Sequence, residues 1–189
     1  MQTISAILWR KLDSPGHDAC RLEQSDSAWQ LDGCAVFLES SGRTAQLHYR
    51  VRCDKAWRTQ WGTVKGWLGG RTVDACFTRD ARGKWKRDDD IFPNLERCID
   101  LDLGFTPATN LIALRRMNLA IGESAEAPAA WLDLSADHLD ELSQRYRRTS
   151  DSCYAYDAPR FGYAASLEVA PIGFVLHYPG LWQVESISR

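Results

Sequence analysis

A two-residue alternation of apolar and polar side chains constrains the fold of this chain more than any other feature. Between residues 45 and 52, apolar side chains alternate with polar or charged ones, and the same pattern runs through 72–78 and 161–169. Successive side chains of a β-strand point to opposite faces, so this period is typical of strands with one buried face. The sequence therefore predicts a fold built mainly from half-buried strands.

Turn signals separate the alternating segments. Glycine and proline occur between them, for example at 41–42, 69–70, 80–83 and 178–180. We count about fourteen segments, most of them too close together for parallel crossovers, which predicts a mainly antiparallel sheet. So many strands favour an all-β barrel or a strongly curled sheet, because large open sheets curl or split. Since the chain has 189 residues and no evident linker, we expect one domain over 1–189.

At most one or two short helices are expected. The clearest candidate is 136–147, where Ser135 could cap the N-terminus and Leu139, Leu142 and Tyr146 would share one face.

Composition narrows the possible partners. The formal net charge is −2, so no overall basic field is available to gather nucleic acid, and we expect no nucleic-acid partner. No apolar run approaches the ~20 residues of a membrane-spanning helix. The start of the chain lacks the features of a signal peptide, and the six cysteines form no CxxC pair. These features predict a cytoplasmic protein with reduced thiols and no zinc site.

Motifs for catalysis or cofactor binding are not evident. The sequence lacks GxSxG, HExxH, Walker A and GxGxxG patterns, and its four histidines are scattered. We therefore expect no catalytic residues, no cofactor and no metal, and an enzymatic role is not the favoured interpretation.

Charged side chains interrupt an apolar central segment at residues 98–117. We predict two strands around a turn at 104–110, with Asp100 and Asp102 on one face of the first strand. Arg115 and Arg116 would lie among apolar residues on opposite faces of the second strand. A buried guanidinium needs an acceptor, and the two aspartates are the nearest candidates. Such a pair could fix the strand register, or an arginine could anchor a carboxylate, phosphate or sugar hydroxyl in a cavity.

Tryptophan provides the second candidate site. The chain has eight tryptophans, and Trp57, Trp61 and Trp67 would share one face of a strand at 57–68, with threonine and lysine between them. This mixture is compatible with the wall of a ligand cavity, because indole offers an apolar face and a hydrogen-bond donor. Packing in the core or at its rim is the alternative.

The central segment also resembles a known family. The run Asp100–Asn110, followed by Leu114–Arg116, is similar to the signature of the putative glycolipid-binding family of bacterial proteins, formerly a domain of unknown function. Further segments agree in the same order, namely 9–10, 31–33, 49–54 with Trp57, 83–85, 144–146, 154–156 and 178–182. The resemblance covers almost the whole chain. One departure is Ala113, where the family usually has proline.

The resemblance implies a many-stranded sheet wrapped into an incomplete barrel, and a lipid or glycolipid as the ligand. Together with the residue patterns, it makes Arg115, Arg116, Asp100, Asp102 and the three tryptophans the expected ligand-binding residues. Two alternatives stay open. One is an enzyme that uses Asp100 or Asp102 with Arg115, and the other is a packed domain that binds no small ligand.

Overall fold

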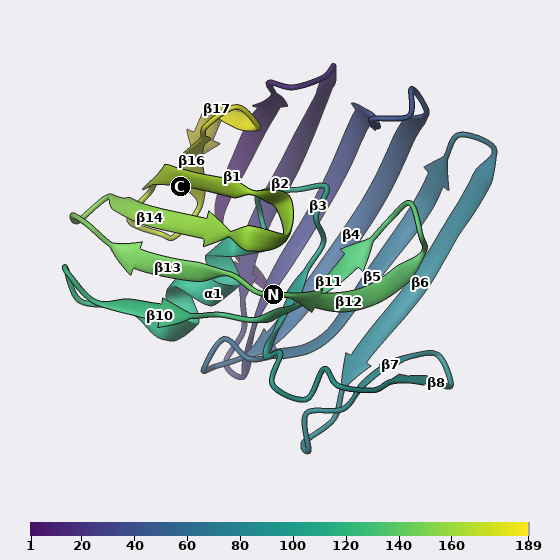
Figure 1. Cartoon of the computed structure of the whole chain (residues 1–189), viewed down its shortest axis with the longest axis horizontal. Helices are drawn as coiled ribbons and strands as arrows, with labels where there is room; N and C mark the ends of the chain where they lie inside the picture. The colour runs from purple at the N-terminus through teal and green to yellow at the C-terminus, as the bar shows by residue number, and fades with distance from the viewer. Residues whose placement is uncertain (189) are drawn as a thin grey trace.

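The computed structural model describes residues 1–188 and is dominated by one large sheet (Figure 1). Fourteen strands form this sheet, and every neighbouring pair in it is antiparallel. In spatial order, its strands are β10 (Ser124–Glu126), β13 (Arg145–Arg148), β14 (Cys153–Ala158), β15 (Tyr163–Val169), β16 (Val175–Tyr178), β17 (Trp182–Ser188), β1 (Gln2–Lys11), β2 (Gly16–Gln24), β3 (Ala28–Leu38), β4 (Thr44–Asp54), β5 (Thr59–Leu68), β6 (Arg71–Arg79), β7 (Trp85–Arg87) and β8 (Asp90–Phe92). The sheet does not close, which confirms the predicted curled, incomplete barrel.

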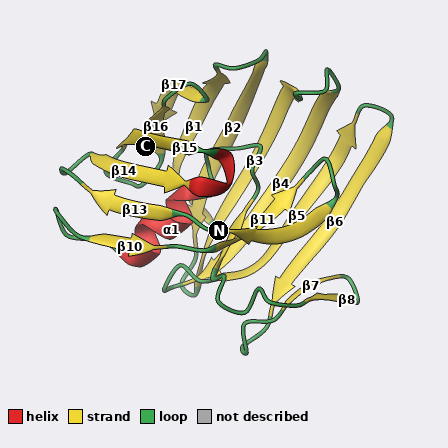
Figure 2. Cartoon of the chain, viewed as in Figure 1, coloured by secondary structure: helices red, strands yellow, loops and turns green. Residues whose placement is uncertain are grey.

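A smaller group of elements lies in front of the long strands β1–β6, as Figure 2 shows. A second sheet has the order β12 (His138–Leu142), β11 (Ala129–Asp133) and β9 (Asp100–Asp102), with β9 parallel to β11. The helix α1 (Asn110–Met117) follows β9, and a 3-10 turn η1 (Pro159–Phe161) precedes β15. The amide of Leu101 donates to the hydroxyl of Thr59 on β5 at 3.2 Å, so β9 is fastened to the large sheet.

The predicted alternation is confirmed by burial. On β4, the side chains of Ala45, Leu47, Tyr49 and Val51 are buried, whereas the residues between them are exposed or partly exposed. β6 has the same pattern. The buried side chains of these strands belong to the same hydrophobic cluster as those of β9 and α1, so the curled sheet and the elements within it share one core.

The second predicted strand of the central segment is wrong, because Arg115 and Arg116 lie on α1. Residues Leu111–Leu114 are buried on every side of the helix, so apolar periodicity cannot distinguish a helix from a buried strand here. Leucine, alanine, arginine and methionine are strong helix formers. Asn118 ends the helix in the left-handed conformation, with φ 45° and ψ 47°. Because Ala113 is helical, the departure from proline there does not concern a strand ladder.

The predicted helix at 136–147 is also wrong, since this segment forms β12 and β13. Leu139 and Leu142 belong to the small sheet and Tyr146 belongs to the large one. The chain passes between sheets at Ser143–Gln144, so two short strands produce the apparent helical spacing. Ser135 caps no helix, and its hydroxyl donates to Glu39 at 3.1 Å.

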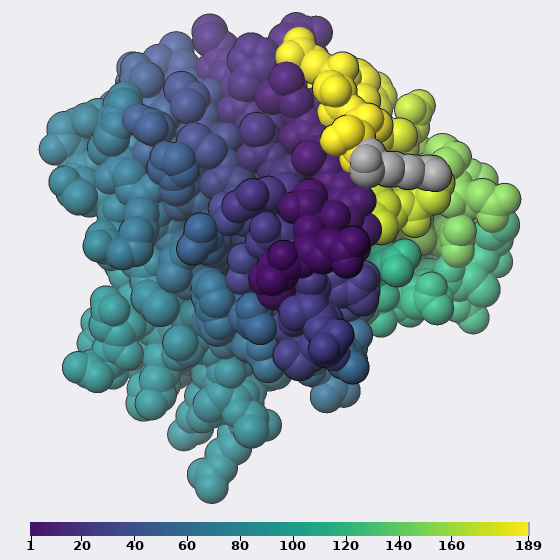
Figure 3. Space-filling view, turned by 180° about the vertical axis from the view of Figure 1, so that it is seen from behind, coloured from purple at the N-terminus to yellow at the C-terminus, as the bar shows by residue number. Residues whose placement is uncertain are grey.

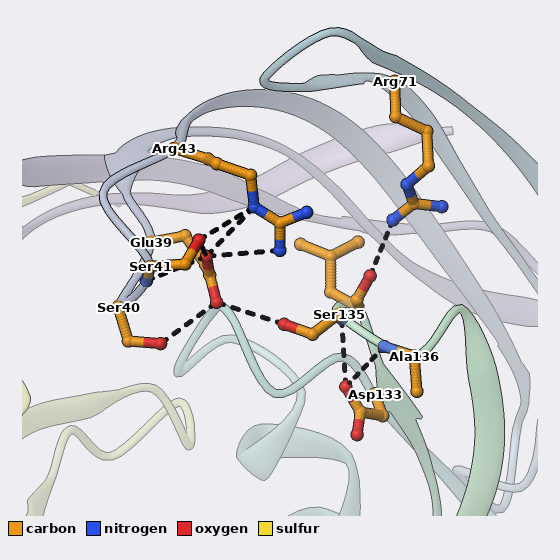
Figure 4. A network of polar contacts seen from close by, with 9 residues as sticks. Glu39, Ser40, Ser41, Arg43, Arg71, Asp133, Ser135 and Ala136 are labelled. Atoms are coloured by element: carbon orange, nitrogen blue, oxygen red, sulfur yellow. Dashed lines mark hydrogen bonds and ion pairs between the residues drawn. The ribbon is translucent and has the colours of Figure 1, made fainter.

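Polar contacts fasten the turn between β11 and β12 to the turn between β3 and β4 (Figure 4). Glu39 accepts hydrogen bonds from Ser41, Ser40, Ser135 and Arg43, and the bonds from the three serines, that of Ser41 above all, lower its pKa to about 2. Arg71 donates to the carbonyl of Leu134 at 2.6 Å. Asp133 accepts the amides of Ser135 and Ala136, two of the four residues in the turn. The small sheet is therefore held to the large one at its far end as well as at β9.

All six cysteines lie within the described residues and are free thiols. Three of them, Cys20, Cys53 and Cys98, are buried in the core. Within residues 1–188, no helix has the length and apolar character needed to cross a bilayer.

A candidate ligand-binding cavity

A buried carboxylate, Asp18 on β2, ties the large sheet to the loop before α1. It accepts hydrogen bonds from the hydroxyls of Tyr49, at 2.9 Å, and Thr106. Tyr49 reaches Asp18 by passing over Gly33, where a Cβ atom would lie 2.3 Å from the tyrosine ring. Burial raises the pKa of Asp18 to about 6, although both hydrogen bonds act in the opposite direction.

A second buried carboxylate, Asp100, forms a bidentate ion pair with Arg116. The Nε and Nη2 atoms of the guanidinium lie 2.8 and 2.6 Å from the two carboxylate oxygens. Burial raises the pKa of Asp100 even though Arg116 stabilises its charge. The predicted arginine–aspartate pair is therefore present, but it joins β9 to α1 rather than two strands. Since neither residue lines the cavity described below, the pair is a structural link beside it.

The third carboxylate, Asp102, faces a cavity. Its residue is 9% exposed, and its Oδ1 atom accepts the amide of Gly104 at 2.8 Å. No residue in the described chain donates a hydrogen bond to its Oδ2 atom. Burial raises the pKa of this carboxyl to about 6, against the effect of the Gly104 amide. Since no side-chain oxygen or nitrogen among residues 1–188 is both buried and without a partner, the Oδ2 atom is accessible from the cavity, where water or a ligand can donate to it.

The cavity has a volume of about 580 Å³ and lies between the end of β9, the start of α1, and strands from both sheets. Within residues 1–188, six of its sixteen lining residues are aromatic, two are carboxylates, and none is lysine or arginine. The residues are Asp13, Ser40, Asp102, Gly104, Thr106, Pro107, Asn110, Trp131, Leu142, Tyr156, Ala158, Phe161, Tyr163, Tyr178, Leu181 and Trp182. This volume is in the range of sites for small organic ligands, roughly 300–1,000 Å³.

Aromatic contacts hold the walls of the cavity in place. Trp131 on β11 meets Phe161 edge to face, with ring centroids 5.3 Å apart, and the Arg160 guanidinium lies 4.8 Å from the indole. Tyr163 contacts both Tyr156 and Tyr178, at 6.1 and 5.4 Å between centroids. The cavity therefore presents ring faces fixed by neighbouring rings.

Hydrogen bonds already occupy several donors around the cavity. The Asn110 amide nitrogen donates to the hydroxyl of Tyr146 at 2.8 Å. The hydroxyl of Tyr156 donates to Gln144 at 2.8 Å, and that of Tyr163 donates to the carbonyl of Pro179 at 2.6 Å. Thr106 donates to Asp18. In residues 1–188 nothing donates to the Asn110 side-chain oxygen, so the free polar atoms of the cavity include two acceptors, on Asp102 and Asn110.

The predicted binding residues are dispersed. Arg115 lies in a separate apolar groove with Ile4, Ile172 and Leu176, and its guanidinium is 5.6 Å from the ring of Trp57. Trp57 precedes β5, is buried, and stacks on Trp29 with centroids 4.5 Å apart.

Trp61 and Trp67 lie on the outer face of the large sheet, whose N-terminal strands Figure 3 shows from behind. The predicted shared face of Trp57, Trp61 and Trp67 on the concave side is thus wrong, because residue 57 is in a turn with φ 63° and residues 61 and 67 point outward. Their threonine and lysine neighbours are the solvated side of β5. Trp61 lines a shallow outer groove with Thr63 and Lys65.

A family model that matches almost the whole chain shows which family the protein belongs to. The model of the family described as "Putative glycolipid-binding" matches residues 6–184. The chain belongs to this family. Among solved structures, the protein is similar to a DUF1089 family protein from Pseudomonas aeruginosa, with a TM-score of 0.79 and 30% sequence identity over 93% of this chain and 94% of that chain. A comparison with curated proteins gave no match.

The glycolipid-binding family signature lies at the centre of the fold. Residues 100–116 form β9, the loop and α1 inside the curl, and supply Asp102, Gly104, Thr106, Pro107 and Asn110 to the cavity. Of the predicted binding residues, only Asp102 is in the cavity lining. Sequence reasoning missed its aromatic walls. Their signal was present in the segments 154–156 and 178–182, where tyrosine and tryptophan accompany strand alternation.

Proposed function

We propose that this protein binds a lipid or glycolipid non-covalently, with the polar head group in the cavity beside Asp102. The observation that carries the proposal is Asp102, a largely buried residue whose Oδ2 atom opens onto a cavity with aromatic walls and has no donor within the described chain. A hydrogen bond to a charged acceptor is stronger than one between neutral groups, so a ligand that donates to Oδ2 gains affinity there.

The aromatic walls favour the same class of ligand. Tyrosine and tryptophan offer broad apolar faces, which suit the C–H faces of a sugar ring or the start of an acyl chain. A few fixed polar groups among such rings are typical of small-molecule sites. The description of the family as glycolipid-binding supports this proposal.

A second candidate function is catalysis by Asp102. A carboxyl with a pKa near 6 in a cavity is suited to exchange protons at neutral pH. The sequence left open an enzyme that uses Asp100 or Asp102 with Arg115. The structure does not bring these residues together, because Asp100 is paired with Arg116 and Arg115 faces another groove. Binding is therefore the function that the geometry favours.

The direct test is native mass spectrometry of the purified protein, together with tryptophan fluorescence titrated with a panel of alkyl glycosides and lipids. We expect a retained or added amphiphile at one-to-one stoichiometry and a saturable fluorescence change. The variant Trp131→Phe should lose part of that change, whereas Trp67→Phe on the outer face should not. The packed-domain alternative prevails if no amphiphile in the panel binds saturably. Chemical conversion of an added glycoside or lipid during incubation with the protein would instead favour catalysis.

A further inference from the structure

We propose that the cavity selects head groups that donate hydrogen bonds and carry no negative charge, and that Asp102 discriminates against phosphate and carboxylate head groups. This inference rests on the proposed function, because it names the class of ligand that the same site would take.

The charges around the cavity are the first support for selection against anionic head groups. Among the described residues, 1–188, the lining contains the carboxylates of Asp13 and Asp102 and no cationic side chain. Nearby cations already have acidic partners. Lys11 pairs with Asp13, and Arg160 pairs with Asp140 at 2.6 Å.

Behind the lining, Arg116 is likewise engaged with Asp100, at 2.6 Å. An anionic head group would therefore enter a partly desolvated site next to a carboxylate, and no free guanidinium or ammonium of residues 1–188 lines that site to offset its charge. Like charges at close range in such a site repel strongly.

The hydrogen-bonding atoms of the cavity are the second support for this head-group selectivity. The hydroxyls of Thr106, Tyr156 and Tyr163 already donate to groups of the protein, and so does the amide nitrogen of Asn110. Among residues 1–188, nothing donates to the Oδ2 of Asp102 or to the side-chain oxygen of Asn110, and the indole N–H groups of Trp131 and Trp182 in the lining have no acceptor. Sugar hydroxyls both donate and accept, so they match this combination, whereas a phosphate, which accepts, leaves both acceptors of the protein unsatisfied.

The test compares amphiphiles that share one chain and differ in the head group. Octyl glucoside, octylammonium and octyl phosphate are titrated below their aggregation concentrations at pH 8, where Asp102 is ionised. Isothermal calorimetry and tryptophan fluorescence give the affinities. We expect octyl phosphate to bind at least tenfold more weakly than octyl glucoside, and Asp102→Asn to reduce this ratio at least threefold.

The matched control is Asp74→Asn, which changes the net charge equally but lies on the exposed face of β6 beside Lys65. It should leave the head-group ratio unchanged. Octyl phosphate binding as tightly as the glucoside would overturn the inference and leave the proposed function standing. An equal effect of the two substitutions would overturn the role of Asp102.

If none of the three compounds binds saturably, the proposed function fails and the inference fails with it. Should Asp102→Asn lack the circular dichroism spectrum of the folded protein, the wild-type ratio of phosphate to glucoside affinity decides the question by itself.

Discussion

At the scale of single residues, the two neighbouring arginines of α1 have opposite roles. Arg116 is bonded to the buried carboxylate of Asp100, whereas Arg115 is exposed beside Trp57. Arg116→Met should lower the free energy of unfolding by about 3–5 kcal/mol, because it leaves Asp100 buried without a partner. Arg115→Met should lower it by no more than about 1 kcal/mol, the range of an exposed cation–aromatic contact. Urea denaturation of both variants measures the difference, and equal losses would contradict it.

Asp18 gives a pH-dependent prediction. Its pKa is about 6 in the folded protein and 3.8 for the unperturbed group, so the folded state holds the proton more tightly. The stability that comes from the protonated form is complete below pH 4 and is lost as the pH rises through 6. Asp18→Asn should therefore gain stability relative to the wild type between pH 4 and pH 7, by up to about 3 kcal/mol.

Urea denaturation of the wild type and of Asp18→Asn at pH 4 and pH 7 checks this prediction, because it gives the free energy of unfolding of each protein. The wild type carries the same raised pKa at Asp102 as the variant does, so that contribution cancels from the comparison. An unchanged stability difference between pH 4 and pH 7 would show that Asp18 does not titrate as described.

Residue patterns predicted an arginine–aspartate pair, but not which arginine. The need of a buried guanidinium for an acceptor follows from its charge alone. The choice of Arg116 over Arg115 depends on the helical direction of each side chain in α1, which alternation on a strand cannot give. Asp102 was predicted for the same reason as Asp100, and both are buried, but Asp100 is paired with Arg116 whereas Asp102 faces the cavity.

At the scale of elements, strands with one solvent-exposed face were predictable from the sequence, whereas elements enclosed by the curled sheet were not. β4 and β6 alternate because one face meets water. α1 is enclosed from Asn110 to Leu114, so no polar face marks its period. The short strands β12 and β13 are joined by two residues while they change sheets, which imitates a helix. The failures therefore occur where tertiary burial, and not local preference, sets the element.

The end of α1 allows this difference to be tested. Asn118 adopts the left-handed conformation after the last helical turn and is exposed. Asparagine and glycine tolerate that conformation, whereas alanine is strained in it. Asn118→Ala should lower the melting temperature, with a loss of about 1 kcal/mol, and Asn118→Gly should leave stability within a few tenths of a kcal/mol. On a strand, as the alternation predicted, glycine would be the more harmful substitution, so a larger loss for Asn118→Gly would contradict the helix end.

At the scale of the whole molecule, the decisive pairings join distant parts of the chain. β1 pairs with β17, so the N-terminal and C-terminal halves meet in the middle of one sheet. Turn signals predict neighbouring hairpins, but no local signal specifies this contact or the enclosure of β9 and α1. The cavity depends on both, because its lining includes residues of β9, α1, β11, β12 and the strands β14–β17. The residues of its aromatic walls could therefore be identified only once the structure showed how the N-terminal and C-terminal halves of the chain are arranged.

Gly33 tests how the interior is fastened to the sheet. It lies on β3 beneath the ring of Tyr49, which crosses it to reach Asp18 and approaches Thr106. Gly33→Ala would place a Cβ atom 2.3 Å from that ring, so the ring must move and Asp18 loses a hydrogen bond. Overpacking and the lost bond together should cost about 2–4 kcal/mol.

Gly70→Ala is the matched control for this last prediction. Gly70 lies in the turn between β5 and β6, and a Cβ atom added there meets nothing within 4 Å. Its effect should remain within about 0.5 kcal/mol, as for most surface substitutions. Thermal and urea unfolding of both variants give the comparison. Because Thr106 both bonds to Asp18 and lines the cavity, Gly33→Ala should also weaken octyl glucoside binding in the folded variant. Equal stability of the two variants would mean that the Tyr49–Asp18–Thr106 network does not hold the interior to the sheet.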